Sequence, residues 1–173
     1  MKKVAVVFAD GMEEIEALTP VDLLRRAGAT VDTVSVSGAF PTGSHNIAVK
    51  ADKLVEQTDF GVYDCIVIPG GMPGATNISK NEKVISALSE FMEKGKTVCA
   101  ICASPAVVLA GHGLINGRKA TCYNAPVFVG ALGESYTGSD VEVDGNLITA
   151  NGPKSAMKFA LAICEKLGIL AGF

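Results

Sequence analysis

Apolar residues follow two patterns that alternate along this chain. Continuous apolar runs of strand length occupy residues 4–8, 65–68 and 97–101, which is typical of strands covered on both faces of a parallel sheet. Apolar residues three or four positions apart fill residues 13–27, 81–93 and 153–167, and this spacing predicts amphipathic helices. The alternation predicts an α/β fold with a doubly wound, mostly parallel sheet in a three-layer α/β/α arrangement.

Shorter segments add detail to this prediction. Residues 31–36 and 120–123 predict strands, and residues 47–49 predict a short strand at an edge. Residues 106–110 predict a helix that Pro105 opens, and residues 141–149 predict a hairpin that turns at residues 144–146. No linker, repeat or low-complexity stretch interrupts the chain, so we expect one domain over residues 1–173.

The composition narrows the class of protein. A net charge of −3 without a basic stripe argues against nucleic-acid binding, and no apolar run approaches the roughly 18 residues of a membrane helix. The apolar run after the basic N-terminus is too short for a signal peptide. The five cysteines lack metal-site spacing, and their odd number indicates free thiols in a reducing compartment. We therefore expect a cytoplasmic protein without a bound metal.

Cys102 is the residue with the clearest chemical potential. It lies between the strand predicted at residues 97–101 and the helix that Pro105 opens. Backbone N–H groups and the positive end of a helix dipole converge at such a join and favour the thiolate. We expect Cys102 to be a nucleophile and the most acidic of the five thiols; the alternative is a small buried hydrophobe. Cys99 and Cys102 form a Cys-x-x-Cys pair, but Cys99 lies inside the strand, which argues against a redox pair.

Two other segments should meet Cys102, because the carboxyl ends of parallel strands lie along one edge of the sheet. Glu16 follows the first strand, and a carboxyl group beside a reactive thiol must be protonated or share a proton with it. Its neighbours Glu13 and Glu14 are expected to be solvated. Residues 70 and 71 are both glycines, and the absence of side chains there allows a backbone N–H to point at a reacting oxygen.

Three segments together resemble the ThiJ/PfpI superfamily, most closely its small single-domain branch, which includes the parkinsonism-associated protein deglycase. They are Glu-Glu-Ile-Glu at residues 13–16, Cys-Ile-Val-Ile-Pro-Gly-Gly-Met-Pro-Gly at residues 65–74 and Ala-Ile-Cys-Ala-Ser-Pro at residues 100–105. The resemblance spans nearly the whole chain and implies a flavodoxin-like fold. It implies that Cys102 is the nucleophile, that Glu16 hydrogen-bonds its sulfur, and that Gly71 and Ala103 supply oxyanion-type amides.

The resemblance also implies partners and further residues near the site. The branch is usually dimeric through its first helix, so we expect a homodimer, and Arg26 matches a position that reaches the neighbouring site. Tyr123 stands where the branch often has a His. Asn151 and His45 stand where human-like members carry an Arg. We expect these three residues to line the site.

The function expected from the resemblance is stress protection through Cys102 and Glu16. Glyoxalase or deglycase action on small aldehydes or glycated groups would need no cofactor, and it should be slow because Tyr123 replaces the usual His. A redox-sensing or chaperone-like role through oxidation of Cys102 is the alternative. A cysteine peptidase is a third possibility, but it needs a His beside the thiol, and neither His45 nor His112 lies in a matching motif.

Overall fold

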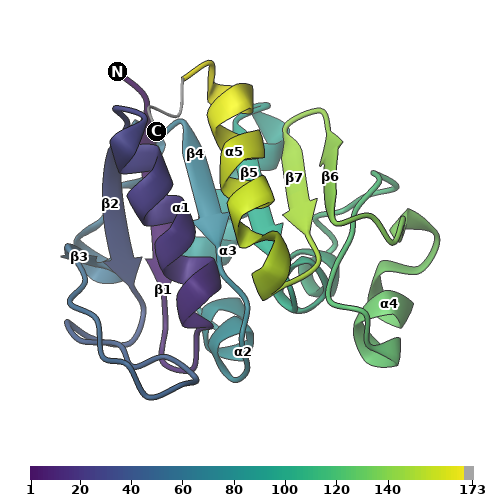
Figure 1. Ribbon diagram of the computed structural model, residues 1–173, viewed down its shortest axis with the longest axis horizontal. Helices are drawn as coiled ribbons and strands as arrows, with labels where there is room; N and C mark the ends of the chain where they lie inside the picture. Colours follow the sequence, from purple (N-terminus) through teal and green to yellow (C-terminus); the bar gives the residue numbers. More distant parts are fainter. Residues whose placement is uncertain (170–173) are drawn as a thin grey trace.

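The computed structural model describes residues 1–169, in which a seven-stranded sheet lies between two layers of helices (Figure 1). The strand order is β3-β2-β1-β4-β5-β7-β6, and all neighbouring strands are parallel except β6 and β7. The strands are β1 Lys3–Phe8, β2 Thr30–Ser35, β3 Lys53–Leu54, β4 Cys65–Ile68, β5 Thr97–Ile101, β6 Val141–Asp144 and β7 Leu147–Ala150. This architecture confirms the predicted doubly wound, mostly parallel sheet.

Helices cover both faces of this sheet. They are α1 Glu14–Arg26, α2 Gly74–Ser79, α3 Glu82–Glu93, α4 Pro126–Leu132 and α5 Ala156–Leu167. The helices α1 and α5 lie side by side over one face (Figure 1) and share one apolar core with it. The helix α3 and the turns that follow β5 pack in a second core on the other face. The three predicted amphipathic helices are therefore confirmed, and their apolar stripes face the sheet.

The continuous apolar runs become strands because each of their side chains has a core to enter. In β1, Val4, Val6 and Phe8 point to the core under α1 and α5, whereas Ala5 and Val7 point to the opposite core. Successive side chains of a strand alternate between faces, so a strand buried on both sides needs apolar residues at every position. This requirement explains why β1, β4 and β5 could be recognised as strands although their apolar and polar residues do not alternate.

Two of the shorter predicted strands are wrong. In the segment at residues 47–49, Ala48 makes only an isolated bridge to Thr42, and the edge position is taken by β3 instead. In the segment at residues 120–123, Ala120 makes only an isolated bridge to Tyr136. Residues 120–122 of this second segment are nevertheless buried, whereas Tyr123 is exposed. An apolar pattern cannot show which backbone will supply the hydrogen-bonding partner.

Two other elements differ from the sequence interpretation. The helix expected at residues 106–110 is present as one wide π-helical turn, Pro105–Leu109, followed by a tighter turn, Ala110–His112. The helix α4 was not predicted, although Phe128, Val129 and Leu132 lie on one face of it and pack against the core. The predicted hairpin is confirmed as β6 and β7.

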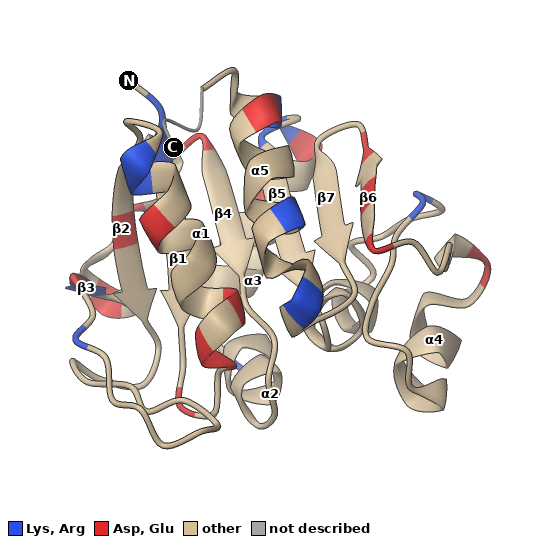
Figure 2. Cartoon of the chain, viewed as in Figure 1, with Lys and Arg blue, Asp and Glu red and all other residues tan. Residues whose placement is uncertain are grey.

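Most charged residues lie on the outside of this framework, but the acidic residues at the start of α1 (Figure 2) are buried. Within residues 1–169, no helix combines the length and the apolar character that crossing a membrane requires.

Shortening Phe159 to Ala should test the core under α1 and α5. The Phe159 side chain is fully buried there, so Phe159→Ala removes a large packed group and leaves a cavity. We expect a loss of about 3–5 kcal/mol in the free energy of unfolding, measured by urea denaturation. The control Glu165→Ala changes an exposed position of the same helix and should alter the value by less than about 0.5 kcal/mol. Equal effects of the two changes would contradict this account of the core.

Candidate active site

Residues that follow three neighbouring strands converge at the carboxyl edge of the sheet. Cys102 follows β5, Gly70 and Gly71 follow β4, and Glu16 lies in the first turn of α1 after β1. Because β1, β4 and β5 are adjacent in the sheet, segments that are far apart in sequence are brought together here. The fold therefore assembles a thiol, a carboxyl group and a glycine loop at one place.

Cys102 is held in a backbone conformation that few side chains adopt. Its φ is 65°, in the left-handed region that normally favours glycine. Two backbone hydrogen bonds hold it there: its N–H donates to the Ala150 carbonyl at 2.9 Å, and its carbonyl accepts the Tyr123 N–H at 2.8 Å. A strained residue between a strand and a helical turn is the usual setting of a nucleophile elbow. Cys102 alone of the five cysteines is partly exposed.

Ser104 connects the elbow to the loop that follows β4. Its hydroxyl is fully buried and donates to the Pro69 carbonyl at 2.5 Å. This bond joins the segment that carries Cys102 to the segment that carries Gly70 and Gly71. Sequence analysis assigned no role to Ser104. Its position two residues after the nucleophile was the one feature that could have indicated a role in the site.

Glu16 reaches the elbow through Gly70. The Glu16 side chain is fully buried, and its Oε2 accepts the Gly70 N–H at 2.8 Å. A Cβ atom added to Gly70 would lie 2.6 Å from the Cys102 Cβ and 2.6 Å from Glu16 Oε2. Gly70 therefore lies directly between the cysteine and the carboxyl group, and a side chain there would force them apart.

Burial and mutual contact set the proton affinities of this pair. Burial raises the pKa of Glu16 to about 7; the Glu13 charge adds to the rise, while hydrogen bonds from Cys102 and the Gly70 amide oppose it. Burial also raises the pKa of Cys102 to about 12, as do the charge and hydrogen bond of Glu16, against the lowering effect of the Gly71 and Ala103 amides. Two groups this close titrate as one pair that shares a proton.

The expectation that Cys102 is the most acidic thiol is therefore wrong. Burial raises the pKa of Cys122 to about 11, which is below that of Cys102. The dipole argument considered only the amides at the elbow and omitted desolvation and the carboxylate beside it. Glu16 therefore loses its proton at a much lower pH than Cys102, and the thiol keeps its proton around neutral pH.

Tyr123 and Asn151 lie beside the elbow and line a common cavity. The cavity has a volume of about 500 Å³ and is lined by Tyr123, Asn124, Asn151, Gly152, Pro153 and Lys154. The Asn151 side chain is committed to its own neighbours: it donates to Asp140 Oδ1 at 3.1 Å and accepts from Ser155 Oγ at 2.6 Å. Neither side chain hydrogen-bonds the Cys102 thiol within residues 1–169.

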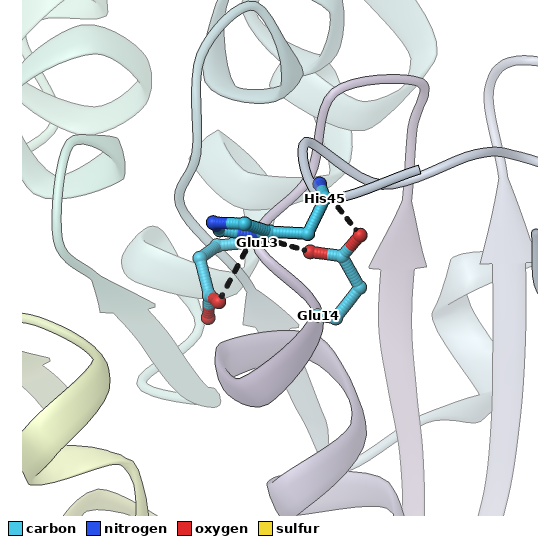
Figure 3. Close-up of side chains that lie close together, drawn as sticks. All are labelled: Glu13, Glu14 and His45. Carbon is cyan, nitrogen blue, oxygen red and sulfur yellow. Dashed lines mark hydrogen bonds and ion pairs between the residues drawn. The ribbon is translucent and has the colours of Figure 1, made fainter. Parts of the chain in front are cut away.

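The other two residues expected near the site lie elsewhere in this chain. Arg26 is in the last turn of α1, at the opposite end from Glu16, and its Nε pairs with Asp22 Oδ1 at 2.8 Å. His45 lies beside Glu13 and Glu14 (Figure 3), and its Nδ1 is 3.0 Å from Glu14 Oε2. The expectation that Glu13 and Glu14 are solvated is wrong, because both are buried. Glu13 caps α1 by accepting the Glu16 N–H at 2.8 Å.

The remaining histidine and cysteines do not complete a catalytic group with Cys102. His112 Nε2 is 2.9 Å from Ser79 Oγ, and this contact does not involve the segment that carries Cys102. Cys99 Sγ lies 3.6 Å from Cys65 Sγ inside the core, so its sulfur neighbour is Cys65. In the described part of the chain, no His contacts the thiol, and the triad that a cysteine peptidase needs is not formed.

Comparison with known proteins identifies the family of this chain. Residues 2–166 match the model of the DJ-1/PfpI family. The chain is 35% identical over 170 residues to the Parkinson disease protein 7 homolog of Danio rerio, covering 96% of this chain and 89% of the relative. It is 40% identical over 166 residues to protein DJ-1 homolog B of Arabidopsis thaliana, covering 95% of this chain but only 37% of that longer relative.

Solved structures give the same result. The structure of oxidized Toxoplasma gondii DJ-1 superposes with a TM-score of 0.92 at 43% identity, over 96% of this chain and 91% of that one. Drosophila melanogaster DJ-1beta superposes with a TM-score of 0.90 at 35% identity, over 99% and 91%. With its matching family model, its fold and its elbow cysteine, this chain belongs to the DJ-1/PfpI family.

Proposed function

We propose that this protein is a cofactor-independent, stress-protective enzyme that uses Cys102 to act on small reactive aldehydes or the groups they have glycated. The observation that carries the proposal is the contact between a strained, partly exposed thiol and a buried carboxyl group whose pKa is about 7. A group with a pKa near the working pH can both accept and return a proton. The five free cysteines support a reducing compartment, and we propose the cytoplasm.

The first chemical step is addition of the Cys102 sulfur to the aldehyde carbon. A sulfur–carbon bond forms, the carbonyl π electrons move to oxygen, and a proton makes that oxygen a hydroxyl, which gives a hemithioacetal. The Glu16 carboxylate takes the thiol proton as the bond forms and can deliver it again later. The amides of Gly71 and Ala103 hydrogen-bond the sulfur and favour its thiolate form, which is the attacking nucleophile. The former aldehyde carbon then loses its proton and the adjacent ketone carbon gains one, through an enediol, which oxidises the first carbon, reduces the second and gives a lactoyl thioester. Water hydrolyses this thioester, which breaks the sulfur–carbon bond, releases lactate and returns the Cys102 thiol.

The absence of a His at position 123 limits the rate of this reaction. A phenol hydroxyl donates a hydrogen bond but is a much weaker base than an imidazole, so Tyr123 does not supply a general base. Loss of a positioned base usually costs about 10²–10⁴ in rate. Proton transfer then depends on Glu16 and water.

A redox-sensing role is the second candidate, and one observation favours it. Cys102 is partly exposed, whereas Cys65, Cys99, Cys122 and Cys164 are buried. An oxidant in solution therefore reaches Cys102 first, and the Gly71 and Ala103 amides can stabilise an oxidised, negatively charged sulfur.

Turnover of methylglyoxal separates the two functions. We expect slow conversion to lactate by the wild-type protein, complete loss in Cys102→Ala, and nearly unchanged rates in Tyr123→Phe. Lactate is measured enzymatically after the protein is removed. The variant Tyr123→His should raise the rate if the ring fits. No wild-type turnover would refute the enzyme and leave the redox role, and a collapse of the rate in Tyr123→Phe would show that the phenol takes part.

Replacing Glu16 by Gln should lower the pKa of Cys102 below about 12. The change removes the negative charge and the carboxylate that hold the thiol proton, while burial and the two amides remain. The pH dependence of alkylation at Cys102, followed by peptide mass mapping, gives this pKa. Glu14→Gln is the matched control, because that carboxyl group bonds the His45 loop and does not contact the thiol. An unchanged pKa in Glu16→Gln would reduce Glu16 to a structural carboxyl group.

We also propose a homodimer through α1. Ile15 on α1 and Met157 and Leu161 on α5 are exposed on the face where these helices lie side by side. An exposed apolar face on two packed helices is typical of an interface, and a second copy offers the same face by two-fold symmetry. Arg26 lies on the same helix, and in a dimer it would reach the neighbouring molecule.

Light scattering should give a mass near twice 17.8 kDa. Ile15→Arg places a charge on the proposed interface and should produce monomers. Val127→Arg is the control, because Val127 is exposed on α4, outside this face. A wild-type monomer at micromolar concentration, or equal effects of the two changes, would contradict the proposed interface.

A further inference from the structure

His45, Glu13 and Glu14 form a cluster of potential metal ligands separate from the thiol (Figure 3). His45 Nδ1 lies 3.0 Å from Glu14 Oε2 and 3.8 Å from Glu13 Oε1. One ligand atom from each residue lies within 4.8 Å of the other two. The histidine comes from the loop between β2 and β3 and the carboxyl groups from the start of α1, so tertiary folding assembles the cluster.

Backbone amides orient both carboxylates towards the imidazole. Glu14 Oε1 accepts the N–H of His45 at 2.8 Å and that of Ile47 at 3.4 Å, which leaves Oε2 facing the ring. Glu13 Oε2 accepts the Glu16 N–H at 2.8 Å, which leaves Oε1 free. Within residues 1–169, Glu13 Oε1 has no hydrogen-bond donor, since the His45 nitrogen 3.8 Å away is too distant. Such outer contacts are the kind that hold metal ligands in position.

The negative charge of this cluster is not balanced by a lysine or arginine. The side chains of Glu13 and Glu14 are only 10% and 7% exposed, and no Lys or Arg forms an ion pair with either in the described part of the chain. Burial opposes ionisation of Glu14, but the His45 ring and nearby backbone amides outweigh it and hold the Glu14 pKa below its ordinary value. Buried charges usually have a partner, and here a single imidazole faces two carboxylates.

The separations of the ligand atoms suit a small divalent ion. Zinc binds His nitrogen and carboxylate oxygen at about 2.0–2.2 Å, so two ligands of a tetrahedral ion lie roughly 3.3 Å apart. The measured separations of 3.0 and 3.8 Å bracket that value. The His45 side chain is 70% exposed, so the cluster opens to solvent and a water molecule can complete the coordination.

We propose that His45 Nδ1, Glu13 Oε1 and Glu14 Oε2 bind a divalent first-row metal ion, with Zn²⁺ the best match to this mixed nitrogen and oxygen ligand set. The prediction of no metal site was drawn from cysteine spacing, which does not bear on these residues. The ion fastens the loop that carries His45 to the start of α1. The loop already packs closely there, because a Cβ atom at Gly43 would lie 2.2 Å from Glu14 Oε1.

The site also lies next to the loop that shapes the thiol pocket. The Glu13 N–H donates to the Gly70 carbonyl at 3.0 Å, and a Cβ atom on Gly71 would lie 2.5 Å from the Glu13 nitrogen. A bound ion therefore holds the segment against which Gly70 and Gly71 pack. It requires no turnover at Cys102, so the inference stands apart from the proposed function.

Calorimetric titration of EDTA-treated protein with Zn²⁺ alone tests the proposal. The titration is done in a Cys102→Ser background, so that the thiol and Glu16 do not compete for the ion. We expect one Zn²⁺ per chain and binding at least about 10-fold weaker in His45→Gln and in Glu14→Gln. His112→Gln is the matched control, because the ring of His112 bonds Ser79 and is outside the cluster. The pKa measurements of Cys102 in the Glu16 variants are done in the presence of EDTA, so bound metal does not affect them.

Two further measurements exclude a folding defect or a different site. Circular dichroism and melting without metal should show the variants folded, and Zn²⁺ should raise the Tm of the His112→Gln protein but not of His45→Gln. Co²⁺ bound in place of Zn²⁺ to the Cys102→Ser protein, which retains the other four cysteines, should show no sulfur-to-cobalt charge-transfer band. The proposal is overturned by the absence of Zn²⁺ binding, by equal binding in His45→Gln and His112→Gln, or by a cobalt spectrum with a thiolate ligand.

Discussion

The close approach of Glu16, Gly70 and Cys102 is the contact on which the site depends. The carboxyl group accepts the Gly70 amide, and the absence of a side chain at Gly70 allows the thiol and the acid to come together. The three segments can meet because β1, β4 and β5 are neighbours and parallel, so their carboxyl ends lie along one edge. The Ser104 hydroxyl then donates a hydrogen bond to the Pro69 carbonyl, which holds the Cys102 segment against the loop that carries Gly70. The site therefore depends on the sheet order that places β1, β4 and β5 side by side.

Burial gives this contact its chemical character. In water, a carboxyl group and a thiol would titrate several pH units apart and independently. Here burial raises the pKa of Glu16 to about 7 and that of Cys102 to about 12, and each group alters the pKa of the other, so the charge lies on Glu16 while the thiol keeps its proton. The amides at Gly71 and Ala103 favour the sulfur when the charge moves there. The thiol is therefore controlled by the protonation of Glu16, and the helix dipole has a smaller part than its position suggests.

The first turn of α1 shows how one acidic run supports three different tasks. Glu13 caps the helix, Glu14 anchors the loop that carries His45, and Glu16 pairs with the thiol. All three are buried, although three carboxylates in four residues look like a solvated helix start. The charge of Glu13 also raises the pKa of Glu16, so the tasks are coupled through electrostatics. A change at Glu13 is therefore expected to alter the pKa of Glu16.

The sequence by itself determined the layers of this protein and the place of its nucleophile. Continuous apolar runs identify β1, β4 and β5, because only strands buried on both faces need them, and Cys102 follows one of these strands at a helix start. Strand pairing, the burial of the acidic residues and the pKa of Cys102 depend on residues that are distant in the sequence, so they follow only from the tertiary structure. It left residues 47–49 and 120–123 with isolated bridges only, and residues 47–49 largely exposed, because a short apolar run specifies neither burial nor a hydrogen-bonding partner. It buried Glu13 and Glu14, brought His45 to them, and raised the pKa of Cys102, because desolvation and nearby charge come from residues distant in the chain.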